Sequence, residues 1–150
     1  MEFDTKRLPG SPDVVAPDGS DVRVLLTLEG GGMAHFELAP GRTSRAVAHR
    51  TVAELWYVLA GHGEMWRRQA EREEIVPMEP GVCLSIPTGT RFQFRSIGNT
   101  GLSVLGVTMP PWPGPRRGVR SRRYLATGLT PPRDSLSRVV DPGRGRSCRW

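Results

Sequence analysis

Long apolar runs are missing from this chain of 150 residues, and no stretch reaches the roughly 20 apolar residues that a membrane-spanning helix needs. The start of the sequence, residues 1–4, has neither the basic residues nor the apolar run of a secretory signal peptide. From these two observations we expect a cytoplasmic protein without a membrane partner.

Cysteine is scarce as well. The two cysteines, Cys83 and Cys148, are too few for the disulfide framework of a small secreted domain. Cys83 lies in an apolar segment, where we expect a small core residue, whereas Cys148 lies near the end of a polar segment, where we expect a free thiol. Cys83 has no histidine beside it in the sequence, and we expect no cysteine nucleophile.

Lysine is almost absent, because 20 of the 21 basic residues are arginines. The basic charge is concentrated at one end: residues 1–113 carry 11 basic and 13 acidic side chains, whereas residues 114–150 carry ten arginines and two aspartates. Such a tail can bind the phosphates of nucleic acid. Aromatic residues do not alternate with the arginines as they do in single-strand binders, so we favour a solvated extension and do not expect a nucleic-acid partner.

Helical periodicity is missing between residues 21 and 113, where short apolar runs alternate with Gly and Pro. This pattern is typical of an all-β sandwich or barrel. The expected strands lie near residues 22–28, 32–38, 44–49, 54–60, 63–68, 73–78, 82–86, 91–96 and 102–109. Residues 1–20 are rich in Pro, Gly and Asp and predict an irregular N-terminal arm. Residues 114–150 have too few apolar residues to offset the entropy of ordering, and this Arg/Pro/Gly-rich segment predicts a disordered tail.

Two motifs in the strand region resemble those of the cupin superfamily. The first family motif reads Gly, five residues, His-x-His, three or four residues, Glu, six residues, Gly. The second reads Gly, five residues, Pro-x-Gly, two residues, His, three residues, Asn. This chain keeps the glycines, the proline, one histidine and the glutamate, at Gly41, His49, Glu54, Gly61, Gly81, Pro87 and Gly89. The family's first histidine, last histidine and asparagine are replaced by Val47, Phe92 and Ser96.

The resemblance implies a cupin-type double-stranded β-helix, a jelly-roll barrel, over residues 21–113. It also implies that Val47, His49, Glu54 and Phe92 converge inside the barrel. Cupins that keep three histidines and the glutamate bind one divalent metal there, and this ligand set suits Fe, Mn, Ni or Zn. Here one imidazole and one carboxylate remain, fewer than the three protein ligands of a catalytic zinc site. A metal at His49 and Glu54 therefore needs a further ligand, and a site without metal is equally open.

Strand alternation places further side chains beside this pair, because residues two apart in a strand point the same way. Trp56 shares a face with Glu54, and Phe94 shares one with Phe92. Aromatic rings suit a pocket for a small organic molecule, and the alternative is that they only fill the barrel core. The expected pocket residues are Val47, Trp56, Phe92, Phe94 and His35, the last being also the first candidate for a third metal ligand. The residues expected to face the other way are Arg91, Gln93 and Arg95.

Three functions stay open. In the first, His49 and Glu54 form an acid–base pair that isomerises, epimerises or cyclises a small organic molecule. Sugar-nucleotide epimerases, which are cupin relatives, resemble this in using a histidine base without metal. In the second, the barrel binds a small ligand without catalysis, and in the third a rebuilt metal site supports metal-dependent catalysis. The resemblance also implies a homodimer, because cupin barrels often pair by exchanging edge strands, and edge strands need covering.

Overall fold

The computed structural model describes residues 3–112 and 119–120, and these residues form strands and turns only. The strands are β1 (Val14–Val15), β2 (Asp21–Leu28), β3 (Gly31–Leu38), β4 (Val47–Ala48), β5 (Ala53–Ala60), β6 (His62–Gln69), β7 (Arg72–Met78), β8 (Cys83–Ile86), β9 (Arg91–Ile97), β10 (Leu102–Met109) and β11 (Val119–Arg120). The expected all-β fold is confirmed. Within this part of the chain there is no helix that could cross a membrane.

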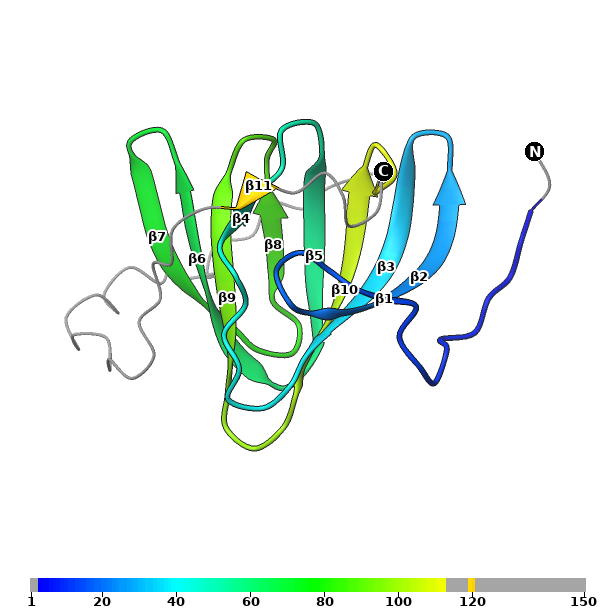
Figure 1. Cartoon of the computed structure of the whole chain (residues 1–150), viewed down its shortest axis with the longest axis horizontal. Helices are drawn as coiled ribbons and strands as arrows, with labels where there is room; N and C mark the ends of the chain where they lie inside the picture. The colour runs from blue at the N-terminus through cyan, green and yellow to red at the C-terminus, as the bar shows by residue number, and fades with distance from the viewer. Residues whose placement is uncertain (1–2, 113–118, 121–150) are drawn as a thin grey trace, which may run out of the picture.

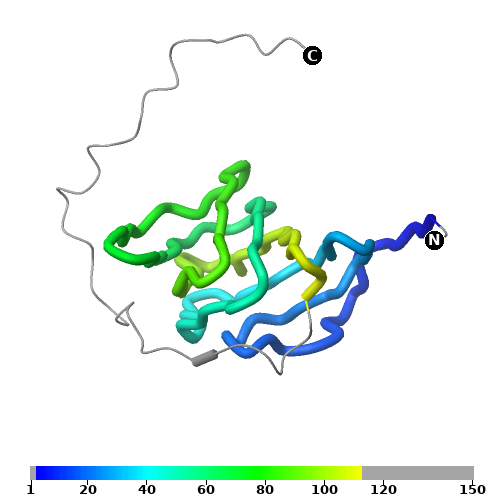
Figure 2. Tube along the Cα trace, turned by 90° about the horizontal axis from the view of Figure 1, so that it is seen from above, coloured from blue at the N-terminus to red at the C-terminus, as the bar shows by residue number. Residues whose placement is uncertain are grey.

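The strands pair antiparallel in two sheets, as Figure 1 shows. One sheet has the order β1-β2-β3-β10-β5-β8, and the other has the order β11-β4-β9-β6-β7. The chain changes sheet at every step from β3 to β6, stays in one sheet for the β6–β7 hairpin, and changes sheet again at every step from β7 to β10. Seen from above in Figure 2, the sheets curve around a common interior. This alternation is the double-stranded β-helix that the sequence predicts.

Alternation along each strand decides what enters the interior. On β5, Glu54, Trp56 and Val58 are buried, whereas Leu55 and the other intervening side chains are exposed. The interior is closed by aromatic and branched side chains from both sheets, and the core includes Phe36, Trp56, Met65, Phe92, Phe94 and Val104. Because the glutamate is in phase with these apolar residues, the strand carries a carboxylate into the core.

Cys83 lies on the opposite side from the one that the sequence predicts, whereas Gln93 lies on the predicted side but is buried. Cys83 is exposed, because Leu84 and Ile86 take the inward positions of β8 and leave Cys83 on the outer face. Gln93 does point away from the barrel core, yet it is fully buried, and its side-chain amide donates to the carbonyl of Ser44 at 2.7 Å. The segment before β4 therefore covers part of the outer face of β9.

Both flanking segments add a strand to the barrel. Within the expected arm, β1 pairs with β2, with Val14 opposite Val22. Within the expected tail, Val119–Arg120 forms β11 and pairs with β4. The expected strand at 44–49 is reduced to Val47–Ala48, because the residues before it form irregular backbone bonds to β9 and to Asp18. The rest of residues 114–150 lies outside the described part of the chain.

The motif glycines Gly61 and Gly81 both have left-handed backbone angles, with φ of 79° and 94°. Their surroundings differ. A Cβ on Gly61 would collide with the carbonyl oxygen of Gly101, whereas a Cβ on Gly81 would meet no atom within 4 Å. At position 61, both the backbone conformation and a close backbone contact require glycine. At position 81, only the conformation favours it.

Replacing these glycines by alanine should separate the two constraints. Gly81→Ala should cost about 1 kcal/mol of unfolding free energy, because only left-handed strain is added. Gly61→Ala should cost about 1–3 kcal/mol more, because the new methyl also forces the backbone of β6 away from Gly101. Urea unfolding of both variants measures the difference, and equal losses would show that the close contact does not constrain the turn.

Candidate functional site

The first motif places His49 and Glu54 in direct contact inside the barrel. His49 Nε2 lies 2.9 Å from Glu54 Oε1, and the indole nitrogen of Trp56 donates to Glu54 Oε2 at 2.7 Å. Glu54 is only 3% exposed. Trp56 reaches the carboxylate because the two residues are two apart on β5 and share its inner face. Both carboxylate oxygens thus have a partner, which a buried carboxylate requires.

The second motif holds the first in place. Gly89, in the turn that follows Pro87, donates its backbone N–H to the carbonyl of His49 at 2.8 Å. Gly89 has a φ of 82°, an angle that favours glycine. His49 follows β4 directly, so this bond fixes the backbone from which the imidazole projects toward Glu54. The two motifs, about 40 residues apart, form one site.

A small cavity of about 20 Å³ lies beside the pair, which is room for about one water molecule. One wall is aromatic. Phe36 stacks on Trp56 with ring centroids 5.3 Å apart, and Phe92 meets Trp56 edge-on at 5.8 Å. Val47 and Trp112 line the same cavity. Any ligand larger than water therefore requires a covering segment to move.

One covering segment comes from the expected irregular arm, where Ala16, Pro17 and Asp18 line the cavity. Asp18 Oδ1 accepts from both the backbone N–H and the hydroxyl of Ser20, at 2.8 and 2.6 Å. Burial raises the pKa of the Asp18 carboxyl, and the nearby Glu54 charge raises it further, although the Ser20 bonds act in the opposite direction. The sequence prediction missed Asp18, and the turn pattern Pro-Asp-Gly-Ser at 17–20 was the available signal.

The structure brings together most, but not all, of the predicted pocket residues. Val47, Trp56 and Phe92 line the cavity. Phe94 packs edge-on against Trp56 at 5.1 Å and belongs to the core behind the cavity wall. Trp56 and Phe92 thus follow the prediction that the rings line a pocket. Phe94 follows the alternative that they fill the core.

His35 is corrected by the structure, because it does not line the cavity. Its neighbours Ala34 and Phe36 take the inward positions of β3, so His35 is buried on the outer face of the sheet. Its Nε2 lies 2.6 Å from the hydroxyl of Ser103, and burial together with the Arg23 charge lowers its pKa. His35 cannot serve as a third ligand to a metal at His49 and Glu54.

The donor atoms at the pair do not fit a resident divalent metal. The Nε2 of His49 and Oε1 of Glu54 face each other at hydrogen-bond distance, and Oε2 is engaged by Trp56. Among the described residues, no group of three or more His, Cys, Asp or Glu side chains could hold a metal ion. Three protein ligands are usual at catalytic zinc sites. The chemistry of this site therefore comes from its side chains.

Replacing Asp18 by asparagine should stabilise the protein at pH 7. The raised pKa means that the charged carboxylate costs stability above its folded-state pKa, and the cost is absent below the unfolded value of 3.8. Asparagine keeps an oxygen for Ser20 and removes the charge. Thermal unfolding should show a higher midpoint for Asp18→Asn at pH 7, at roughly 2–4 °C per kcal/mol for a chain of this length.

The difference in unfolding midpoint between Asp18→Asn and the unmodified protein should shrink as the pH falls toward 3.8. The reason is that the Asp18 carboxyl takes up its proton at a higher pH in the folded state than in the unfolded state. Asp21→Asn, at an exposed position of β2, serves as the matched control. A lower midpoint for Asp18→Asn at pH 7 would mean that the carboxylate stabilises the segment instead.

Solved structures similar to this one share its barrel. The BH2720 protein of Bacillus halodurans has 20% sequence identity and a TM-score of 0.56, over 67% of this chain and 74% of that one. KdgF from Halomonas has 12% identity and a TM-score of 0.59, over 73% and 97%. A recombinant oxalate oxidase in complex with glycolate has 20% identity and a TM-score of 0.61, over 74% and 61%. Identities this low show a common fold only.

No curated protein matches the sequence. The family described as "Cupin domain" matches residues 34–108, which is half of the chain and includes both motifs. The matched residues run from β3 to β10 and contain the His49–Glu54 pair. The chain therefore belongs to the cupin family.

Proposed function

We propose that this cupin binds a small organic molecule beside His49 and Glu54 and transfers a proton on it. The observation that carries the proposal is the 2.9 Å contact between the imidazole and a buried carboxylate at the edge of an aromatic cavity. An imidazole paired with a carboxylate in this way is a common general base. Isomerisation, epimerisation and cyclisation are the reaction classes that need such a base and no redox partner.

Each side chain has a separate part in this reaction. Glu54, fixed by Trp56, holds the imidazole and stabilises the positive charge that it gains with a proton. The second ring nitrogen of His49, Nδ1, has no partner among the described residues and is the atom that would accept the proton. Asp18 faces the same cavity, and its raised pKa favours a carboxyl that can return a proton.

The size of the cavity sets a condition on this function. About 20 Å³ does not hold an organic substrate, so Trp112 or the segment with Asp18 must move aside when one binds. Both lie in segments that flank the barrel strands, and Trp112 is only partly buried. The aromatic rings beneath them would then offer an apolar surface to the ligand.

Two alternatives use the same cavity. A non-catalytic domain that binds a small ligand would need the same opening of the cavity and would use the same aromatic surface. A metal-dependent enzyme with a rebuilt site is not favoured, because the described residues hold no group of three or more His, Cys, Asp or Glu side chains that could bind a metal ion.

Proton transfer can be tested without knowing the substrate, because a base that removes a carbon-bound proton exchanges it with solvent. A panel of sugars and 2-oxo acids in D₂O is followed by ¹H NMR for loss of signals beside the carbonyl group. We expect exchange with at least one compound, with His49→Ala slower by about 100-fold or more. Glu54→Gln should also slow exchange, since it removes the charge that supports the imidazolium.

His62→Ala is the matched control, because His62 is an exposed histidine at the start of β6. It should leave exchange unchanged. Saturable binding of a panel compound without exchange would favour the non-catalytic alternative. Exchange that survives in His49→Ala would contradict the role of this histidine.

We also propose that two chains pair through the outer face of the sheet that contains β5. Leu55, Tyr57 and Leu59 are exposed along β5, Met109 is exposed on the neighbouring strand β10, and Met33 is exposed on β3, which is next to β10. An uncharged apolar patch of this kind is self-complementary, as a two-fold interface requires. A second copy of the chain is therefore the occupant that we expect.

Light scattering after size-exclusion chromatography should report a dimer. Tyr57→Glu and Leu59→Glu should convert it to a monomer, because a charge would be buried at the interface. Ile75→Glu, which alters an exposed apolar residue on β7 of the other sheet, should leave the dimer intact. A monomeric wild-type protein would refute the proposal.

A further inference from the structure

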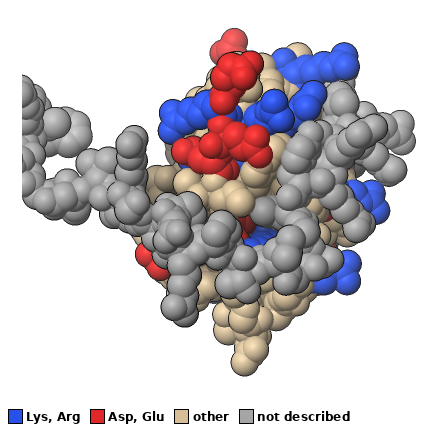
Figure 3. Space-filling view, turned by 90° about the vertical axis from the view of Figure 1, so that its left-hand side faces the viewer, with Lys and Arg blue, Asp and Glu red and all other residues tan. Residues whose placement is uncertain are grey.

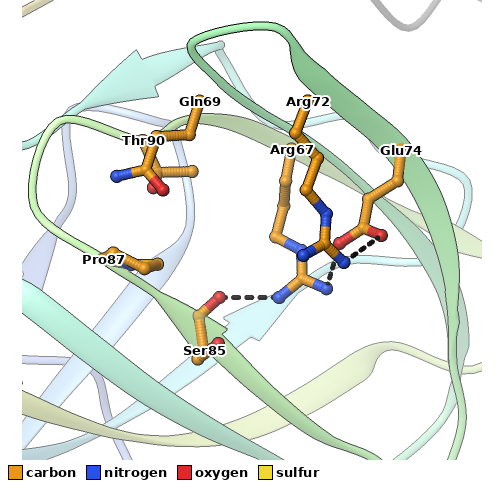
Figure 4. Close-up of a pocket in the computed structure, with 7 residues that line it drawn as sticks. All are labelled: Arg67, Gln69, Arg72, Glu74, Ser85, Pro87 and Thr90. Atoms are coloured by element: carbon orange, nitrogen blue, oxygen red, sulfur yellow. Dashed lines mark hydrogen bonds and ion pairs between the residues drawn. The ribbon is translucent and has the colours of Figure 1, made fainter.

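A second, larger hollow of about 120 Å³ lies where the edge strands β7 and β8 of the two sheets approach each other. Figure 4 shows its two sides. Arg67 and Arg72 stand on one side with Glu74, and Pro87, Gln69 and Thr90 stand on the other. Its volume is well above the ~15 Å³ that one water molecule needs.

The hollow is separate from the His49 cavity. No residue that lines one lines the other. Phe92 lines the His49 cavity, and its neighbour across β9 and β6, Arg67, lines the hollow. The inference drawn from this hollow therefore does not rest on the proton-transfer function.

The charges at the hollow are positive on balance. Glu74 accepts from Arg67 Nη2 at 2.6 Å and from Arg72 Nη2 at 3.1 Å, so one carboxylate stands between two guanidinium groups. One positive charge is left over. Figure 3, which shows the side of the molecule with β7, has basic and acidic side chains gathered together over this region. The Arg72 side chain is 81% exposed and can turn toward a ligand.

Two polar atoms of the lining residues have no partner. Arg67 already donates through Nη1 to the carbonyl of Ser85 at 2.6 Å, but its Nε has no acceptor among the described residues. Thr90, which is 3% exposed, likewise has a hydroxyl with no hydrogen bond there. A buried donor without a partner costs about 1–3 kcal/mol. Both atoms belong to residues on opposite sides of the same hollow but are themselves covered, so a bound molecule satisfies them once the two side chains turn toward it.

We propose that this hollow binds a small organic carboxylate. A carboxylate matches the planar donor fork of arginine and carries the single negative charge that balances the site. Its oxygens would accept from Arg67, Arg72 and the Thr90 hydroxyl, and its carbon skeleton would lie against Pro87. The hollow is thus an anion site of the barrel, distinct from the His49 site and placed between the edges of the two sheets.

The proposal is tested by titrating the ¹⁵N-labelled full-length chain with sodium acetate, sodium glycolate and sodium phosphate at constant ionic strength. We expect saturable shifts of the Arg67 Nε–H and Thr90 amide resonances with acetate or glycolate. Arg72→Gln should weaken binding about tenfold, as expected for the loss of a charge-assisted hydrogen bond. Thr90→Val, which keeps the side-chain shape, should weaken it several-fold.

Arg68→Gln is the matched control. It removes the same charge from the next position of β6, whose side chain lies on the other face and pairs with Glu73. This variant should bind within twofold of wild type. Equal losses in Arg68→Gln and Arg72→Gln would mean that only general charge attracts the anion. Shifts that do not saturate, or tighter binding of phosphate than of either carboxylate, would overturn the proposal.

Discussion

The carboxylate of Glu54 has to be satisfied inside an apolar barrel, and the surrounding structure is built around that requirement. Burying an unpaired carboxylate would cost far more than a small domain can tolerate. Trp56 and His49 each bind one oxygen, at 2.7 and 2.9 Å. Trp56 is fixed by its place on the same strand, whereas His49 has to be brought from β4. The bond from Gly89 to the His49 carbonyl does this, so the two motifs are linked through one buried charge.

The two replaced histidines change what the interior can do. At the two positions where the cupin motifs have histidines, this chain has Val47 and Phe92. These residues are paired across β4 and β9 and belong to the apolar core. Phe92 touches both Trp56 and the His49 ring, at centroid distances of 5.8 and 5.7 Å. With apolar side chains at these positions, the interior holds one imidazole and one carboxylate in contact at 2.9 Å.

Sequence motifs were sufficient to predict the barrel and its central pair, because the positions of glycine and the alternation of apolar residues are local properties. The strand from Leu102 to Met109 was predicted to the residue. The positions of two other side chains, Asp18 and His35, were harder to predict from the sequence. Asp18 lies in a segment with no strand pattern, and its place follows from the β1–β2 pairing and a backbone bond to Arg45. For His35, no local pattern decides which face of β3 points inward, because Ala34, His35 and Phe36 are all buried.

The barrel and its covering segment differ in how firmly they are held, and this difference bears on function. Strands β3, β10 and β5 are paired along nearly their whole length, whereas β1 contributes only two pairs to β2. Burial raises the pKa of the carboxyl of Asp18, just beyond β1, so keeping this group in the covering segment costs free energy at pH values above 3.8. Segments of low local stability are the ones that open under native conditions. The same aspartate that helps to close the cavity therefore also lowers the free energy needed to open it, and a molecule larger than water can enter only when this segment moves.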